Sequence, residues 1–403
     1  MLKVGYVSES LSVHDYRYLK KANNSDVKVF LFAIKEAVPP EILALPNIEV
    51  YHNELLVKYS KCRSRIMSYI YLFAVMRELK KWIKQIKPDV LHPGWVSGSG
   101  FITALAGFHP YLLMPWGSDI LIFPKINARI RQMVKYAVRK ADMIYCDCMD
   151  VKNDIVNSYG YPSEKITVFP FGIELDVFNP NRTEEAKKIR RSLGWENNKI
   201  LVMNRTFAPE YNVECFLSAL PAIFDAVPEA RVFLMGSGPL ESRFKQFVKD
   251  TAMQDKVNFT GFVSQTELAD HLCASDIYVS TSLTDGTSLS LLEAMACRLP
   301  VVVTNVPANM EWIKDGVGGY VVPLGKAEMS AQNIELSRAG KLDVGSGASA
   351  LLAKRLISLL EADTLRDAMA ERNLAVAREK ADWDKNFGKF VALYHELAAA
   401  RKG

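Results

Sequence analysis

Cysteine is sparse in this sequence, with 6 residues in a chain of 403. The six are scattered, and none forms a C-x-x-C pair or joins histidines at the spacing of zinc ligands. A disulfide-built scaffold and a structural zinc site are therefore excluded, and we expect free thiols in a reducing compartment. Glycine, at 22 residues, is too rare for a collagen-like chain.

Long hydrophobic runs are also missing. The longest apolar-rich stretch, residues 66–75, contains Ser68 and lies between Arg65 and Arg77, so it is too short to cross a bilayer. The chain begins with a strand-like run at residues 3–7 and lacks the pattern of a signal peptide. We expect a soluble, cytoplasmic protein that can lie peripherally at the inner face of a membrane.

Acidic residues are scarce in one part of the chain. The formal net charge is +5, yet residues 51–140 hold 15 Lys/Arg and only 4 Asp/Glu. Residues 181–403, by contrast, hold 27 Lys/Arg and 28 Asp/Glu. This uneven distribution indicates an anionic partner, either nucleic acid, anionic lipid or a phosphorylated substrate. The apolar content of 49% excludes a disordered chain, and the length indicates two or three domains.

The positive charge is concentrated in residues 58–87 and 125–140. Apolar and aromatic residues alternate with the cations of the first segment, which is typical of a helix that lies in a membrane interface. The equal alternative is that the apolar side packs in the core and the charges are only solvated. Because no recognition motif for nucleic acid accompanies the charge, we expect no nucleic-acid partner.

Short β-branched runs alternate with helix-length segments, which predicts a parallel α/β architecture. The predicted strands fall into two series: residues 3–7, 27–32, 90–92, 111–115, 143–146 and 167–169, then 199–204, 231–236, 257–260, 277–280, 300–304 and 319–322. Two series of about six strands favour two doubly wound domains. We place the connection between them within residues 171–195, and we predict an inserted polar loop with one short helical turn at residues 325–348. Helical patterns follow at 351–361, 364–379 and 384–401.

The most informative segment is residues 280–297. A strand ends at Ser280, and a polar loop with Asp285 leads into a helix whose first main-chain N–H groups form an anion site. Glu293 lies eight positions after Asp285, inside the helix, where a carboxylate can bind the hydroxyls of a ribose. Asp285 can contact a hydroxyl of a sugar. The alternative is that Asp285 caps the helix and Glu293 is exposed to solvent.

These residues resemble the family 4 glycosyltransferases, which have the GT-B fold. The family has two acidic residues separated by seven others before a Glu-Ala-Met-Ala run, as Asp285 and the run from Glu293 to Ala296 have here. Asp replaces the usual Glu at the first position. The resemblance implies two Rossmann-like domains facing across a cleft: residues 1–178 for the acceptor, residues 179–383 for the donor, and a helix at 384–403 that crosses back to the first.

Other positions match the family in the second domain. The resemblance places Arg205 on the donor diphosphate, where a bidentate guanidinium is suitable. The Lys that often follows is missing from residues 209–212, so either Arg243 replaces it or the helix start contributes more. Further donor-binding candidates are Gly236 and Gly238 in a glycine-rich turn, Val263 beside the base, and Gly286, Thr287, Ser288 and Leu289 at the helix start.

The first domain matches more weakly. Residues 89–92 resemble a strand end of the family, and residues 170–174 resemble its stretch before the linker. Trp116 stands where many members have His, which leaves Asp119 as a polar candidate near the reacting sugar or as a turn residue. His14, after the first strand, is either a substrate contact or a packing residue.

The resemblance implies a retaining transfer of a sugar from a nucleotide-sugar to a glycan or lipid-linked acceptor in cell-surface polysaccharide or glycolipid synthesis. We expect a UDP-sugar rather than a GDP-sugar as donor, and no metal ion or other cofactor. Two alternatives remain: a nucleotide-sugar epimerase on the same fold, or a non-catalytic protein that binds a sugar nucleotide. The oligomeric state is not predicted.

Overall fold

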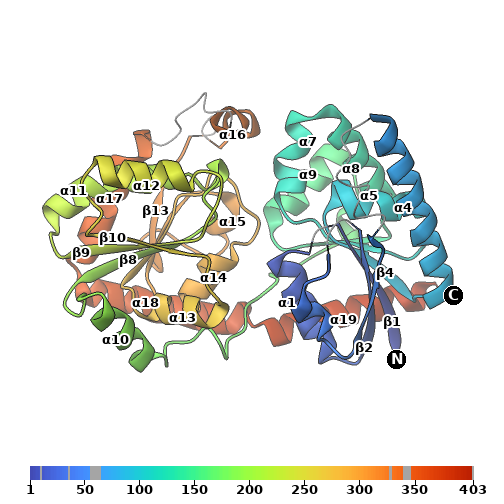
Figure 1. Ribbon diagram of the computed structural model, residues 1–403, viewed down its shortest axis with the longest axis horizontal. Coiled ribbons are helices and arrows are strands. Elements are labelled where there is room, and N and C mark those ends of the chain that lie inside the picture. Colours follow the sequence, from blue (N-terminus) through green and yellow to red (C-terminus); the bar gives the residue numbers. More distant parts are fainter. Residues whose placement is uncertain (10, 35–36, 55–64, 326–328, 339–345, 402–403) are drawn as a thin grey trace. The chain divides into compact units, whose positions relative to one another are not determined.

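The computed structural model describes residues 1–9, 11–34, 37–54, 65–325, 329–338 and 346–401. The chain forms two compact units (Figure 1). Unit 1 consists of Met1–Phe169 with Asp384–Gly403, and unit 2 consists of Pro170–Trp383. The boundary lies earlier than the expected one at residue 178, because Ile173 and Phe178 are fully buried in the core of unit 2.

Unit 1 is built on parallel strands. One sheet has the order β3-β2-β1-β4 and another the order β5-β6-β7. Isolated parallel bridges join Leu91 to Tyr111 and Gly94 to Met114, next to β4 and β5. The strands are β1 (Leu2–Ser8), β2 (Val27–Ala33), β3 (Ile48–His52), β4 (Val90–Pro93), β5 (Leu112–Leu113), β6 (Met143–Cys146) and β7 (Ile166–Val168).

Helices connect these strands, because parallel neighbours need crossover connections. They are α1 (Val13–Asn23), α2 (Pro40–Leu43), α4 (Arg65–Ile86), α5 (Phe101–Ala106), α6 (Ser118–Leu121), α7 (Phe123–Ile126), α8 (Ala128–Lys140) and α9 (Met149–Tyr159), with a π-helical turn η1 at Val96–Gly100. Local signals fix some boundaries. Ser12 and Asp15 form a capping box that starts α1, and Asn127 caps α8.

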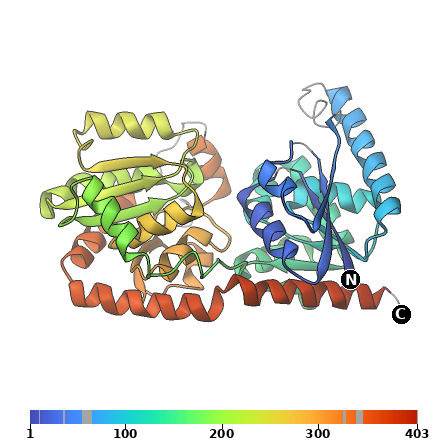
Figure 2. The ribbon, with the colours of Figure 1, turned by 60° about the horizontal axis from the view of Figure 1, so that its bottom comes forward.

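The last helix, α19 (Trp383–Ala400), packs within unit 1 from Asp384 onward. The Tyr394 hydroxyl lies 2.6 Å from the Tyr18 hydroxyl of α1 and 2.5 Å from Nδ1 of His92 at the end of β4. All three side chains are fully buried. Figure 2 shows α19 as the long red helix that passes beneath α1 and the first strands of this unit. Helix α19 thus contributes to the core of unit 1, although it is far in sequence from the other elements of that unit.

Unit 2 contains one parallel sheet with the order β10-β9-β8-β11-β12-β13. Its strands are β8 (Lys199–Asn204), β9 (Ala230–Met235), β10 (Val257–Gly261), β11 (Ile277–Ser280), β12 (Val301–Thr304) and β13 (Gly319–Val322). The main helices are α10 (Thr183–Ser192), α11 (Val213–Ala226), α12 (Glu241–Asp250), α13 (Gln265–Cys273), α14 (Leu289–Ala296), α15 (Pro307–Met310), α16 (Ala331–Arg338), α17 (Ser346–Leu360) and α18 (Asp363–Lys380). The strands are added toward one edge of the sheet from β8 to β10 and toward the other edge from β11 to β13. The order thus switches between β8 and β11, and ligands usually bind at such a switch point.

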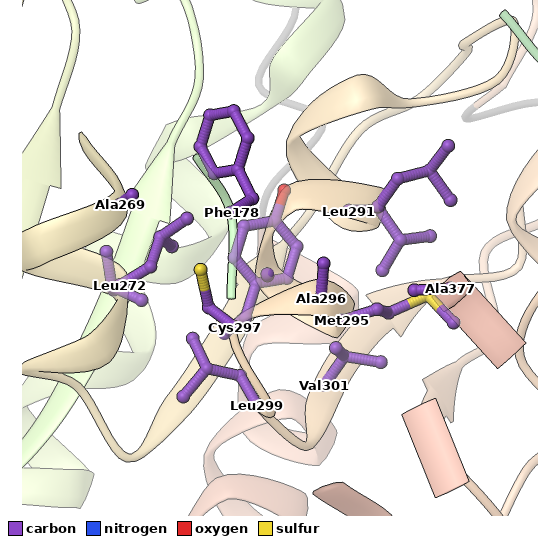
Figure 3. Close-up of a cluster of buried hydrophobic side chains, with 14 of the residues drawn as sticks. Phe178, Ala269, Leu272, Leu291, Met295, Ala296, Cys297, Leu299, Val301 and Ala377 are labelled. Atoms are coloured by element: carbon purple, nitrogen blue, oxygen red, sulfur yellow. The ribbon is translucent and has the colours of Figure 1, made fainter. Parts of the chain in front are cut away.

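Helix α14 lies in the middle of the unit 2 core. Figure 3 shows its residues Leu291, Met295 and Ala296 among buried side chains of α13 and α18, such as Leu272 and Ala377. Every residue of α14 after Leu289 is buried. Polar side chains on such a helix need partners within the protein, so Ser290 and Glu293 have a defined environment.

The predicted α/β fold with two doubly wound domains is confirmed, and all twelve predicted strands are present. Strand β3 was not predicted. The predicted loop at residues 325–348 instead contains α16 and the start of α17, while residues 326–328 and 339–345 lie outside the described residues. No helix in the described part of the chain is long and apolar enough to cross a membrane.

Candidate functional site

The candidate site lies at the switch point of the unit 2 sheet, where β8 and β11 are neighbours. The loop from β11 to α14 is held in place by hydrogen bonds to main-chain carbonyls. Thr281 Oγ1 donates to the Asn212 carbonyl at 2.8 Å, Leu283 N donates to the Glu210 carbonyl at 2.8 Å, and Thr304 Oγ1 donates to the Ser282 carbonyl at 2.5 Å. The loop is therefore fixed between the segment after β8 and the end of β12.

Ser288 caps helix α14, and its hydroxyl accepts from Leu291 N. The alternative that Asp285 caps this helix is therefore wrong. Asp285 turns instead toward Arg205, which follows β8. This geometry brings together two residues that the sequence predicted separately.

Arg205 is 8% exposed and sits at the start of α14. Its Nη1 donates to the hydroxyls of Ser288 and Ser290, both at 2.6 Å, and its Nη2 forms an ion pair with Asp285. The face of the guanidinium lies 4.2 Å from the ring centroid of Tyr211. The buried Nε has no hydrogen-bond partner among the residues that the structure describes. The guanidinium is thus held rigidly, while its Nε–H is left unused.

Burial changes the proton affinity of both members of this ion pair. Desolvation raises the pKa of Asp285, while Arg205 opposes that shift. Desolvation tends to lower the pKa of Arg205, but Asp285 together with Tyr211 and Tyr278 outweighs it, so the pKa of Arg205 is raised and the guanidinium stays charged. Arg205 therefore carries a buried positive charge at the helix start, with the Asp285 carboxylate as its ion-pair partner.

Glu293 is 3% exposed, so the alternative that it faces solvent is wrong. Its Oε2 accepts from Asn204 Nδ2 at 3.3 Å, which links α14 to the end of β8. The Oδ1 of Asn204 is buried and has no hydrogen-bond partner in the described ranges. The end of β8 and helix α14 thus place an amide and a carboxylate side by side.

The glycines at the end of β9 allow a close approach of two loops. Gly236 has φ of +136°, and a Cβ there would collide with the main-chain oxygen of Arg205. A Cβ on Gly238 would lie 2.6 Å from the Phe207 carbonyl oxygen. Phe207 N donates to the Ser237 carbonyl at 2.9 Å. These glycines let the β9 loop touch the main chain that carries Arg205.

Three predicted donor residues make other contacts. Arg243, on α12, is 60% exposed and pairs with Glu214 of α11 at 3.7 Å. Val263 and Leu289 are half-buried and pack against the hydrophobic core. Gly286 and Thr287 are buried in the loop just before the cap residue Ser288.

Three contributors were not predicted: Ser290, Tyr211 and Tyr278. The Tyr278 hydroxyl, on β11, donates to Ser290 Oγ at 3.1 Å, which in turn accepts from Arg205. Tyr211 lies in the segment that lacks the usual Lys. Ser290 could have been predicted, because its hydroxyl comes two positions after the cap residue Ser288. Its hydrogen bond with Tyr278 could not, because no sequence pattern relates the two residues.

In unit 1, Asp119 is fully buried, and its two oxygens accept from Val96 N at 2.8 Å and Trp116 N at 2.9 Å. Burial raises the pKa of Asp119 to about 6. These contacts fit the turn-residue alternative, since the carboxylate organises two loops. The His14 ring packs edge-on against Trp116 with 4.8 Å between centroids.

The basic segments of unit 1 are partly core and partly surface. The apolar side of α4 is buried through Val75, Leu79, Trp82 and Ile86. The cations Arg77, Lys80, Lys81, Lys84 and Lys87 are exposed, and Ile70 and Phe73 beside them are 54% and 69% exposed. On α8, Arg129, Arg131, Arg139 and Lys140 are exposed. Residues 58–64 of the first segment lie outside the described residues.

Within the described ranges, no group of three or more His, Cys, Asp or Glu side chains is arranged to hold a metal ion. The five cysteines whose environment is described are free thiols.

Two Rossmann-like units, with a buried arginine that pairs with a carboxylate at a helix start, are typical of α/β proteins that bind anionic ligands. The family model "Glycosyl transferases group 1" matches residues 185–337, and "Glycosyl transferase 4-like" matches residues 3–148. The chain belongs to the group 1, family 4 glycosyltransferases with the GT-B fold, and it is a glycosyltransferase.

Relatives agree with this assignment. A Bacillus subtilis (strain 168) glycosyltransferase named for teichuronic acid biosynthesis is 28% identical over 281 residues, which are 68% of this chain and 67% of that protein. The alpha-monoglucosyldiacylglycerol synthase of Streptococcus pneumoniae is 29% identical over 194 residues, 46% of this chain and 44% of that enzyme. Among solved structures, Anabaena HepE in complex with UDP-glucose has a TM-score of 0.75 at 17% identity, covering 100% of both chains. That likeness concerns the fold.

Proposed function

We propose that this protein is a retaining glycosyltransferase that transfers a sugar from a nucleoside-diphosphate donor to a glycan or lipid-linked acceptor of the cell surface. The observation that carries the proposal is the buried Arg205 at the start of α14, with an unused Nε donor. A guanidinium beside helical N–H groups is suited to a diphosphate. The relatives named for a cell-surface polymer and a glycolipid support the acceptor class.

In this proposal the leaving diphosphate is stabilised by two groups. Arg205 and the main-chain N–H groups of Gly286 to Ser288 neutralise the charge that develops as the bond to the anomeric carbon breaks. Removal of one such donor in comparable sites lowers the rate about 10²–10³-fold. The protein supplies no nucleophile. The leaving phosphate takes the proton of the acceptor hydroxyl, which attacks the same face of the sugar.

The two carboxylates have separate roles in this proposal. Glu293, buried and bonded to Asn204, binds the ribose hydroxyls, and Asp285 binds a hydroxyl of the transferred sugar. Uridine is the proposed base, a choice consistent with the complex reported for HepE. No metal ion takes part in the proposed reaction, because Arg205 carries the positive charge at the diphosphate.

We also propose that unit 1 contacts an anionic membrane that carries the acceptor. The exposed cations of α4 and α8 support this, together with the exposed side chains Ile70 and Phe73. Each cation near an anionic surface contributes about 1 kcal/mol, so several together are enough for peripheral binding.

The test uses Arg205→Ala and Glu293→Ala, with Arg191→Ala as the matched control. Arg191 is an exposed arginine on α10. UDP-sugars and GDP-mannose are first screened by thermal shift, and transfer is then measured with the stabilising donor, with and without EDTA. We expect at least hundredfold slower transfer in the first two variants, wild-type rates in the control, and no effect of EDTA. Wild-type turnover in both site variants would contradict the assigned roles.

An incubation of donor without acceptor separates the epimerase alternative. Conversion of one UDP-sugar into its epimer under these conditions would favour an isomerase over a transferase. Nucleotide binding without transfer or hydrolysis for any donor and acceptor would favour a non-catalytic protein.

A further inference from the structure

We infer that Asp285 is an internal counter-anion of Arg205, which the donor diphosphate displaces on binding and which returns to expel the diphosphate product. This inference rests on the proposed function, since it concerns how the same site handles its ligand. It adds a second role to Asp285, beyond contact with the sugar.

The first argument is the allocation of the guanidinium donors. Nη1 of Arg205 is used by two neutral hydroxyls, those of Ser288 and Ser290. Nη2 is used by Asp285, and Nε is unused. A bidentate phosphate needs two adjacent donors, and the pair that the serines leave is Nε with Nη2. Asp285 therefore occupies one of the two donors that the diphosphate requires.

The second argument is burial. The side chains of Arg205 and Asp285 are 7% and 17% exposed, so water screens their attraction poorly. The guanidinium cannot turn away to meet a ligand elsewhere, because the Tyr211 ring covers one face and the Ser290 hydroxyl, itself bonded to Tyr278, holds Nη1. A diphosphate must consequently meet Arg205 in place and compete with the carboxylate.

The third argument concerns what Asp285 does once it is displaced. Once displaced, the carboxylate keeps its hydrogen bonds with Ser288 and the Gly286 main chain but loses its ion pair, and a further hydrogen-bond donor is needed in a position where burial already raises its pKa. A sugar hydroxyl on an intact donor supplies such a partner, whereas a free nucleoside diphosphate does not. The exchange therefore favours the donor over the product and promotes release of the product after transfer.

The experiment is calorimetric titration of wild type and Asp285→Asn with UDP, GDP and inorganic pyrophosphate. Asn has nearly the same shape as Asp and retains an acceptor oxygen, but it lacks the negative charge. We expect Asp285→Asn to bind UDP and pyrophosphate about tenfold or more tightly than wild type, with stronger product inhibition and loss of transfer.

The control is Asp250→Asn, which removes the same charge from an exposed site on α12. It should bind like wild type, because only net charge changes. Thermal unfolding checks that each variant is folded, and Asp285→Ser serves as a second charge-free variant. Equal or weaker diphosphate binding by the folded charge-free variants would overturn the inference.

Arg205→Gln distinguishes the two levels of the proposal. If it weakens binding of UDP while Asp285→Asn does not strengthen it, the counter-anion role fails and the donor site stands. If wild type and Arg205→Gln bind all three probes equally or not at all, both the donor site and the counter-anion role fail.

Discussion

Removal of the Tyr394 hydroxyl should destabilise unit 1 more than a single hydroxyl normally does. In Tyr394→Phe, the Tyr18 hydroxyl and Nδ1 of His92 each lose the partner that the structure gives them, at 2.6 and 2.5 Å. All three side chains are 0% exposed, so water cannot replace the lost bonds without opening the core. Each unsatisfied buried polar group costs about 1–3 kcal/mol, so the two groups together give a loss of about 2–6 kcal/mol.

Urea denaturation followed by circular dichroism measures this loss, and hydrogen exchange of the α19 amides assigns it to unit 1. Tyr136→Phe is the matched control, since Tyr136 on α8 is 37% exposed, and its change should stay within about 0.5 kcal/mol. The double variant Tyr18→Phe/Tyr394→Phe should be less destabilised than the sum of the two single variants. The reason is that the Tyr18 hydroxyl, which Tyr394→Phe leaves without a partner, is absent from the double variant. A loss below about 0.5 kcal/mol in Tyr394→Phe would refute the reasoning.

Three further predictions concern other parts of the chain. Gly236→Ala should destabilise unit 2 by about 1–3 kcal/mol in urea and weaken UDP binding, because the new Cβ meets the main-chain oxygen of Arg205. Gly194 also has a positive φ, but a Cβ there meets no other atom, so Gly194→Ala should lower stability without affecting UDP binding. Burial lowers the pKa of His92 to about 3, below the unfolded value of about 6.5. The contribution of neutral His92 to stability is therefore complete above pH 6.5 and falls by about 1.4 kcal/mol per pH unit toward pH 3. Urea denaturation at several pH values should show this slope in wild type and not in His92→Asn. Charge reversal on α4 should abolish co-sedimentation with liposomes rich in anionic phospholipid, and unchanged binding would mean that these charges are only solvated. The residues to change to Glu together are Lys80, Lys81 and Lys84.

Most of the fold could be predicted because buried parallel strands are continuous apolar runs. Strands β11 and β13 have the predicted bounds for this reason. Strand β3 was missed because Glu49 interrupts its short pattern and the strand pairs only with β2 at the edge of the sheet. Helix α4 shows a second limit. Its apolar stripe is equally compatible with a protein core or a lipid surface, and the structure places most of it in the core.

The site could be predicted only in part. The spacing of Asp285 and Glu293 along the chain placed both near one helix, and both lie there. The ion pair between Arg205 and Asp285 depends on β8 and β11 being neighbours in the sheet, which local sequence does not encode. Asp119 illustrates the same difficulty, because its role depends on Val96 N, which is distant in sequence.

The packing of α19 into unit 1 has a consequence for synthesis on the ribosome. Unit 1 begins with the first strands of the chain, yet its buried Tyr394 is translated only after all of Pro170–Trp383. At about 5–20 residues per second, the wait is roughly 10–40 s. During that time the surfaces of α1 and β4 that later receive α19, including Tyr18 and His92, are uncovered. Unit 2 can complete its fold first, so unit 1 reaches its final core only after α19 has been synthesised.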